Sequence, residues 1–387
     1  MLVTAIIVNY NVKYLVYQCV RSLLRSTLAD QVEIFVVDNA STDGSEAFLR
    51  TEFPTINYPQ VHLIFSRENI GFGRANNLAL AQAKGEYVLF INPDTIVTEH
   101  TLNDCYTFAK QHSNLGALGV YMMNDDGRYA PESKRGIPTP LRAFFKLIGL
   151  VALCPKHPLL GQYYLGHLSA HTSAPIEVVS GAYMWVSQKA LRVVGGFDEA
   201  FFMYGEDIDL SYRLLQSGYT NYYFPTPILH YKGESTVKTS WRYVQRFYEA
   251  MLIFYTKHFK HHHALTVWSI KGAIITSGLF ALIRHKLLRR TPSWEEQRSY
   301  LFVVTKASRQ IAEALASKHQ LDAIFSTLET WQYEPQLNER NYIVFDAEAS
   351  DYTTMIHYLH TRPAKQKLAT LYPSRALLIT QQHIYTL

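Results

Sequence analysis

Two acidic residues stand together in a turn-rich stretch and could act as a general base. Glu206 and Asp207 follow Tyr204 and Gly205, so an aromatic ring and a glycine turn adjoin the carboxylates. A carboxylate that is partly shielded from water can take a proton from a hydroxyl group as that group attacks an electrophilic carbon. Acidic residues are also common at helix starts, where they complement the helix dipole. The stretch therefore predicts either a general base or an ordinary helix start.

A second group of residues offers ligands for a divalent metal ion. One apolar run ends in Asn92, Pro93 and Asp94, and a later one ends in His230. Carboxylate and amide oxygens suit Mg²⁺ or Mn²⁺, and a neutral imidazole could complete the coordination shell. Such an ion would neutralise the charge that builds on a departing diphosphate. The alternatives are an Asx-Pro turn at Asn92 and a structural role for His230.

A third feature fits recognition of a nucleotide. Asp38 closes the apolar run 32–37 and begins a polar turn. A carboxylate at the carboxyl end of a strand can accept hydrogen bonds from a base or from ribose hydroxyls. The alternative is a simple turn whose polar side chains cap the next helix.

An alternation of apolar runs and amphipathic stretches positions these residues. It predicts a mainly parallel sheet flanked by helices, an α/β fold, in which ligands gather beyond the carboxyl ends of the strands. After residue 94 the pattern loosens, and an acceptor could bind in the proline-containing stretch 131–158. The strand-like runs lie at 2–8, 32–37, 61–65 and 87–91.

Length and composition limit the classes to which the protein can belong. The 387 residues, with 48% apolar and 18% charged side chains, are typical of a folded globular protein larger than one hydrophobic core. The three cysteines stand far apart without a CxxC pair, which predicts neither disulfides nor a thiolate zinc site. The N-terminus lacks the features of a secretory signal, so we expect a cytoplasmic protein.

The chain divides into three predicted parts. Residues 1–250 would form the main domain, 251–290 a basic, apolar helical segment, and 291–387 a small α/β appendage with a helix near 311–328. Residues 257–290 hold seven Lys or Arg residues and no acidic residue. This pattern fits a helix lying on the cytoplasmic face of the inner membrane, a buried helix, or a membrane span, which the charge of Lys271 disfavours.

The ordered set of motifs resembles the family-2 glycosyltransferases with a GT-A fold, especially their rhamnosyltransferase-like bacterial members. The similarity covers about residues 3–260. It rests on Val8-Asn9-Tyr10-Asn11, Val37-Asp38-Asn39 with Ser41 and Asp43-Gly44-Ser45, Asn69-Ile70-Gly71-Phe72-Gly73 with Asn76-Asn77, Asn92-Pro93-Asp94, Ser180-Gly181-Ala182, Gly195-Gly196-Phe197-Asp198-Glu199, Gly205-Glu206-Asp207, and His230 with Gly233 and Ser235.

This resemblance implies a role for each site residue. Asp207 would be the general base, with Glu206 beside it. Asp94 and His230 would serve Mg²⁺ or Mn²⁺, although the family often has an aspartate where this chain has Asn92. Gly181 and Trp185 would border the acceptor. The nucleotide-sugar would contact Asn9, Tyr10, Asp38, Arg74, Asn77 and Asn92.

The implied activity is inverting transfer of a sugar, rhamnose among the candidates, from a UDP- or dTDP-sugar to a hydroxyl of a saccharide or lipid-linked saccharide in cell-surface polysaccharide synthesis. No nucleic-acid partner is expected. An NAD-dependent oxidoreductase is disfavoured, because Gly71 and Gly73 are followed by Asn76 in place of the third glycine of the dinucleotide fingerprint. A catalytically silent carbohydrate- or nucleotide-binding protein on the same fold would be expected to lack Asp94 or Asp207, and both are present.

Overall fold

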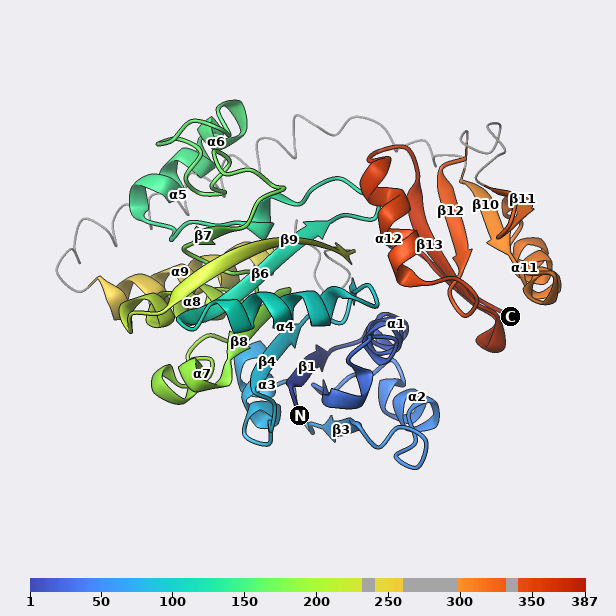
Figure 1. Cartoon of the computed structure of the whole chain (residues 1–387), viewed down its shortest axis with the longest axis horizontal. Helices are drawn as coiled ribbons and strands as arrows, with labels where there is room; N and C mark the ends of the chain where they lie inside the picture. The colour runs from blue at the N-terminus through green and yellow to red at the C-terminus, as the bar shows by residue number, and fades with distance from the viewer. Residues whose placement is uncertain (232–240, 260–297, 332–339) are drawn as a thin grey trace.

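The computed structural model describes residues 1–231, 241–259, 298–331 and 340–387. Most of the basic segment predicted at 257–290 lies outside the described residues, as do Gly233 and Ser235 of the last motif. Figure 1 shows two sheets built from successive parts of the chain, each accompanied by helices. Among the helices described, none combines the length and the apolar character that crossing a bilayer requires.

A nine-stranded mixed sheet forms the larger unit, with strand order β3-β2-β1-β4-β8-β6-β9-β5 and β7 beside β9. The first four strands run parallel, as the alternation predicts, whereas β8 runs antiparallel to both β4 and β6. The α/β fold class is thereby confirmed. The strands are β1 (Val3–Asn9), β2 (Val32–Asp38), β3 (Val61–Phe65), β4 (Tyr87–Ile91), β5 (Thr95–Ile96), β6 (Leu115–Met123), β7 (Ala174–Ile176), β8 (Tyr183–Ser187) and β9 (Thr220–His230).

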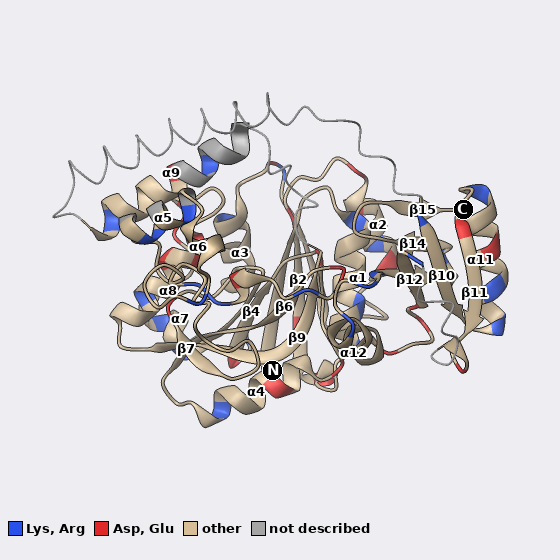
Figure 2. Ribbon diagram, turned by 90° about the horizontal axis from the view of Figure 1, so that it is seen from above, with Lys and Arg blue, Asp and Glu red and all other residues tan. Residues whose placement is uncertain are grey.

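Helices cover both faces of this sheet. The connections β1 to β2 and β2 to β3 advance along the sheet in one direction, and the connection β3 to β4 returns past β1, so right-handed crossovers place α1 and α2 on one face and α3 on the other. Figure 2 shows this division, with α7 and α8 on the side of α3. The helices are α1 (Lys13–Leu24), α2 (Ser45–Glu52), α3 (Phe72–Leu80), α4 (Thr101–Gln111), α5 (Pro140–Leu147), α6 (Leu150–Leu153), α7 (Gln188–Val194), α8 (Glu206–Gln216) and α9 (Trp241–His258).

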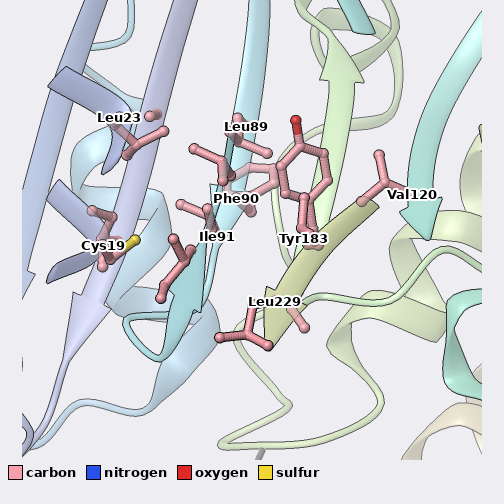
Figure 3. Packing of buried hydrophobic residues seen from close by; sticks show 14 of the residues in the cluster. Cys19, Leu23, Leu89, Phe90, Ile91, Val120, Tyr183 and Leu229 are labelled. Atoms are coloured by element: carbon pink, nitrogen blue, oxygen red, sulfur yellow. The ribbon is translucent and has the colours of Figure 1, made fainter. Parts of the chain in front are cut away.

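The core of the larger unit explains why the central strands are apolar along their whole length. Every residue of β1, β2 and β4 is buried, as expected of strands that helices cover on both faces. Figure 3 shows Cys19 of α1 and Phe90 of β4 in the same cluster as Tyr183 of β8 and Leu229 of β9. This packing fixes the strand ends from which the site residues project.

A second sheet follows, with order β11-β10-β12-β13-β14-β15, parallel over its first four strands and antiparallel over the rest. The helix predicted near 311–328 is wrong in extent, because α11 ends at Lys318 and residues 322–327 pair with β10. The elements are β10 (Ser299–Val304), α11 (Lys306–Lys318), β11 (Asp322–Thr327), β12 (Tyr342–Asp346), α12 (Tyr352–Thr361), β13 (Lys367–Tyr372), β14 (Leu377–Ile379) and β15 (Ile384–Thr386).

Candidate functional site

A cavity of about 390 Å³ opens near the carboxyl ends of β1 and β4 and the start of α8. It brings together residues from segments far apart in the sequence. A second cavity, of about 570 Å³, lies around Lys84 and Lys110 and contains none of the predicted site residues. Of the predicted site residues, the first cavity is lined by Tyr10, Asn92, Asp94, Gly181, Glu206, Asp207 and His230.

A sharp turn delivers the two adjacent carboxylates to the cavity. Tyr204 and Gly205 both have a positive φ, 67° and 84°, which reverses the chain immediately before α8. A Cβ atom at Gly205 would lie 3.1 Å from Ala250 and Phe201, so both the positive φ and the close surroundings favour glycine. Glu206 and Asp207 are therefore the first two residues of α8 and face the cavity.

Glu206 and Asp207 have different surroundings. Burial, and next the charge of Asp207, raise the pKa of Glu206 to about 8. Oε2 of Glu206 is buried and has no hydrogen-bond partner in the described part of the chain. Asp207, in contrast, forms an ion pair with Arg135, and its Oδ2 also accepts a hydrogen bond of 3.0 Å from the backbone N–H of Gly181. Glu206 is thus predominantly a neutral acid at pH 7, beside a paired carboxylate.

Strand pairing places His230 beside Asp94. Thr95 of β5 pairs with His230, the last residue of β9. As a result Nε2 of His230 lies 3.3 Å from Oδ1 of Asp94 and 3.4 Å from the side-chain amide nitrogen of Asn92. Nδ1 of His230 is buried and has no hydrogen-bond partner within the described ranges.

These side chains fit a divalent ion only in part. A carboxylate and an imidazole are suitable ligands for Mn²⁺, and the carboxylate suits Mg²⁺. However, no group of three His, Cys, Asp or Glu side chains with metal-binding geometry occurs among the residues that the structure describes. Asp94 and His230 would therefore need oxygen ligands from elsewhere, and a bound diphosphate is able to supply them.

Asn9 and Asp38 form a buried framework behind the cavity. The amide of Asn9 donates to Oδ1 of Asp38 at 2.6 Å, and Oδ2 of Asp38 accepts from the backbone N–H of Ser41 at 3.1 Å. Both side chains are buried and neither lines the cavity. Their neighbours Tyr10 and Asn39 do line it. Tyr10 and Asn39 thus lie at the surface of the cavity, with Asn9 and Asp38 directly behind them.

Three predicted site residues stand apart from the cavity. Asn77 hydrogen-bonds both the N–H and the carbonyl of Phe197, so it anchors the loop before α8. Arg74 is half exposed and pairs with Glu199. Trp185 is fully buried against Tyr87, because β8 is antiparallel to β4 and Trp185 pairs with Leu89, inside the sheet. The expectation that Trp185 borders the acceptor is therefore corrected: its side chain belongs to the core.

Several cavity residues were missed by the sequence patterns. Asn39 carried a signal, since it follows Asp38 directly, and its amide bonds Asn69 at 2.9 Å. Four others belong to the loop-rich stretch after β6, which includes the short helix α5 and to which the sequence pattern assigned no face. They are Arg135, Lys146, Tyr163 and Tyr164.

Comparison with protein families gives two adjoining matches. The family described as Glycosyl transferase family 2 matches residues 4–168, and Glycosyl transferase family group 2 matches residues 161–305. Together they span the larger sheet and all the cavity residues.

Two proteins similar in sequence agree with these matches. An N-acetylglucosaminyl-diphospho-decaprenol L-rhamnosyltransferase of Mycobacterium tuberculosis is 29% identical over 271 residues, which cover 67% of this chain and 84% of the relative. Rhamnosyltransferase WbbL of Escherichia coli K12 is 30% identical over 172 residues, 42% of this chain and 61% of that protein. A solved structure, mannosyltransferase PcManGT from Pyrobaculum calidifontis with GDP-Man and Mn²⁺, has a TM-score of 0.47 at 20% identity, covering 81% of this chain and 80% of that one. The family matches and the two rhamnosyltransferases identify this chain as a glycosyltransferase of family 2.

Proposed function

We propose that this glycosyltransferase moves a sugar, L-rhamnose first among the candidates, from a nucleotide diphosphate to a hydroxyl of a lipid-linked saccharide, with inversion at the anomeric carbon. The observation that carries the proposal is that one cavity holds both the Glu206 and Asp207 pair and the Asp94 and His230 pair. The activity for which the mycobacterial relative is named supports rhamnose as the sugar and a diphosphate-linked lipid as the acceptor carrier.

In this proposal Asp207 accepts the proton of the acceptor hydroxyl. Arg135 and the N–H of Gly181 both bond Oδ2, and Oδ1 accepts a hydrogen bond of 2.8 Å from the N–H of Ile208. These contacts fix the direction of the carboxylate and leave Oδ1 a second lone pair for the incoming proton. Glu206, being protonated at neutral pH, would act as a hydrogen-bond donor to substrate.

The donor would bind across the opposite side of the cavity. Tyr10 and Asn39 would contact the nucleoside, and the diphosphate would lie near Asp94 and His230. A divalent ion held by Asp94, His230 and the diphosphate would stabilise the negative charge of the leaving nucleotide. Asn9 and Asp38 would act from behind by orienting the rim that carries Tyr10 and Asn39.

The test is nucleotide release from a panel of UDP-, dTDP- and GDP-sugars, with a lipid-linked or soluble saccharide acceptor. We expect release with one donor that depends on acceptor, is lost on chelation with EDTA and returns with Mg²⁺ or Mn²⁺. The anomeric configuration of the product, read by NMR, tests inversion.

Two outcomes would contradict parts of this proposal. Full activity in excess chelator would remove the metal role of Asp94 and His230. Binding of a nucleotide-sugar without transfer to any acceptor in the panel would favour the catalytically silent binding protein.

A further inference from the structure

A protruding stretch beside the cavity exposes large aliphatic side chains. This stretch, here called the docking segment, comprises residues 141–159 and includes most of α5, all of α6 and the turn that follows. In Figure 1, α5 and α6 lie at the end of the molecule away from the second sheet. Aliphatic residues exposed singly are ordinary, but several large ones exposed within residues 141–159 mark a candidate binding surface. The exposed aliphatic residues are Leu141 (52%), Ile148 (49%), Leu153 (77%) and Leu159 (51%).

The docking segment itself contains basic residues and no acidic ones. No Asp or Glu occurs between residues 133 and 176. Arg142 within the segment pairs with Glu177 and so serves the fold, whereas Lys156 is exposed beside Leu153 and Leu159. Exposed aliphatic side chains with an exposed lysine among them, in a stretch of chain without Asp or Glu, are complementary to anionic lipid headgroups over an apolar interior.

The docking segment is held firmly. Nε of Arg142 donates to Oε1 of Gln162 at 2.8 Å, and the N–H of Gly161 donates to the carbonyl of His157 at 2.8 Å. A side chain at Gly161 would collide with the carbonyl of Pro155. The exposed leucines are therefore presented on an ordered turn, so their exposure is a feature of the fold.

The docking segment and the residues just after it also line the cavity. Lys146, Tyr163 and Tyr164 line it together with Asp207. Nζ of Lys146 lies 3.9 Å from the centre of the Tyr163 ring. Lys146 of the docking segment therefore lines the same cavity as the proposed base, Asp207.

We propose that the docking segment rests on an anionic phospholipid bilayer, so that a membrane-anchored acceptor enters the cavity from the side of Lys146. This proposal rests on the proposed function for the nature of the acceptor, but the contact with lipid can be measured without any reaction. Its residues are different from those of the basic segment predicted at 257–290.

The chain offers a reporter within the docking segment. Cys154 is exposed, whereas Cys19 and Cys105, the other two cysteines, are buried. The full-length protein would be labelled at Cys154 with an environment-sensitive fluorophore and mixed with vesicles of phosphatidylglycerol and phosphatidylcholine. We expect a blue shift and an increase in emission. A label at Val193→Cys in a Cys154→Ser background is the control, because Val193 is exposed on α7; its emission should not change.

Substitution of the leucines tests the energetic role of the same surface. Leu153→Asp with Leu159→Asp should weaken vesicle binding about ten-fold or more, since it replaces apolar insertion by charge repulsion. Ile56→Asp with Val193→Asp, which changes two exposed aliphatic residues elsewhere, should bind as the unchanged protein does. Unchanged thermal unfolding of both variants would show that the fold is retained.

The docking proposal is overturned if the Cys154 label does not respond to anionic vesicles, or if the two double variants bind vesicles equally well. Failure of the proposed function would give a different experimental result. A protein that shows the fluorescence shift but transfers no sugar to any acceptor would retain the docking surface and lose the assigned reaction.

Discussion

At the residue scale, Glu206 and Asp207 show how two neighbouring carboxylates acquire different chemistry. Both begin α8, where the helix dipole favours negative charge. Asp207 gains the guanidinium of Arg135, whereas Glu206 is buried beside the charge of Asp207, and the pKa of Glu206 rises to about 8. One residue is suited to accept a proton, and the other already carries one at neutral pH.

The first prediction separates these roles by kinetics. Asp207→Asn should lower kcat about 100-fold or more, because the proposed proton acceptor is lost. Glu206→Gln should have a much smaller effect, because glutamine resembles the protonated acid in shape and in its ability to donate. Steady-state rates would be compared with Glu46→Gln, a change at an exposed residue of α2, and donor binding would be checked by thermal shift. A near-normal rate for Asp207→Asn would refute the base assignment.

The second prediction concerns the effect of Glu206 on stability. Its pKa is raised from an ordinary value of 4.5 to about 8, so the folded state binds the proton more tightly than the unfolded state does. The stabilisation that Glu206 contributes is complete below its ordinary pKa and is lost as the pH rises through about 8. Glu206→Gln should therefore gain in Tm relative to the unchanged protein as the pH rises across this range. A difference in Tm that is constant with pH would contradict the raised pKa.

At the element scale, buried charges fix where α8 begins. Asp209 is fully buried and accepts hydrogen bonds of 2.7 Å from Arg213, Lys257 and His258. Burial alone would raise the pKa of Asp209, but the bonds from Lys257, His258 and Arg213 outweigh it and hold the pKa below its ordinary value. Lys257 also pairs with Asp198 at 2.6 Å. The cluster joins α8, α9 and the loop that precedes α8. It therefore helps to hold the turn at which Glu206 and Asp207 begin α8.

The third prediction tests this cluster. Asp209→Asn would leave three cationic or polar groups without their carboxylate and should destabilise the protein by about 3–5 kcal/mol. Asp322→Asn is the matched control, because Asp322 pairs with Arg340 but is half exposed, and exposed pairs contribute only about 0–1 kcal/mol. Urea unfolding at neutral pH provides the comparison. Equal effects of the two changes would show that the cluster does not hold α8.

The elements also decide which site residues could be predicted. Asp94 follows the parallel strand β4 closely, and the parallel alternation predicts the edge of the sheet at which it lies. His230 ends β9, and only the short pairing of β5 with β9 brings it to Asp94. Arg135 meets Asp207 from an irregular stretch, which has no periodicity to assign a face. Trp185 was misplaced because the local sequence does not reveal that this residue pairs with Leu89 in the middle of the sheet, away from the rim.

At the scale of the whole molecule, the second sheet is joined to the first by buried polar contacts as well as by apolar packing. Nε2 of Gln18 donates to the hydroxyl of Thr370 at 2.5 Å, and Nη1 of Arg25 donates to the carbonyl of Ala347 at 2.7 Å. One hydrophobic cluster includes residues of both sheets. The two sheets are therefore expected to unfold together.

This junction reaches the proposed metal site. The side chain of Gln381 in the second sheet unit donates to the carbonyl of Tyr231 at 2.5 Å. Tyr231 is fully buried and directly follows His230. The second unit therefore helps to hold the chain at the point where β9 delivers His230 to the cavity, which gives residues 298–387 a structural connection to the site.

The last prediction tests the junction through Glu99, which lies between β5 and α4 and acts on a helix of the other unit. Its carboxylate accepts hydrogen bonds of 2.9 Å from the N–H groups of Tyr352 and Thr353 and one of 2.7 Å from the Thr353 hydroxyl, at the start of α12. A negative charge there also complements the helix dipole. Glu99→Ala should lower the free energy of unfolding by about 3 kcal/mol, because hydrogen bonds to a charged group contribute about 1.5–3 kcal/mol each and do not add fully.

The matched change is Glu86→Ala, which removes a half-exposed pair with Lys110 and should lower the unfolding free energy much less than Glu99→Ala does, because solvent screens the pair. Urea unfolding would be followed by circular dichroism and by tryptophan fluorescence. Because the junction ties the two units together, Glu99→Ala should move both transitions to lower urea concentration while keeping them coincident. A transition that splits in the unchanged protein would show that the second sheet unfolds independently, and its contact with Tyr231 could not then stabilise the position of His230.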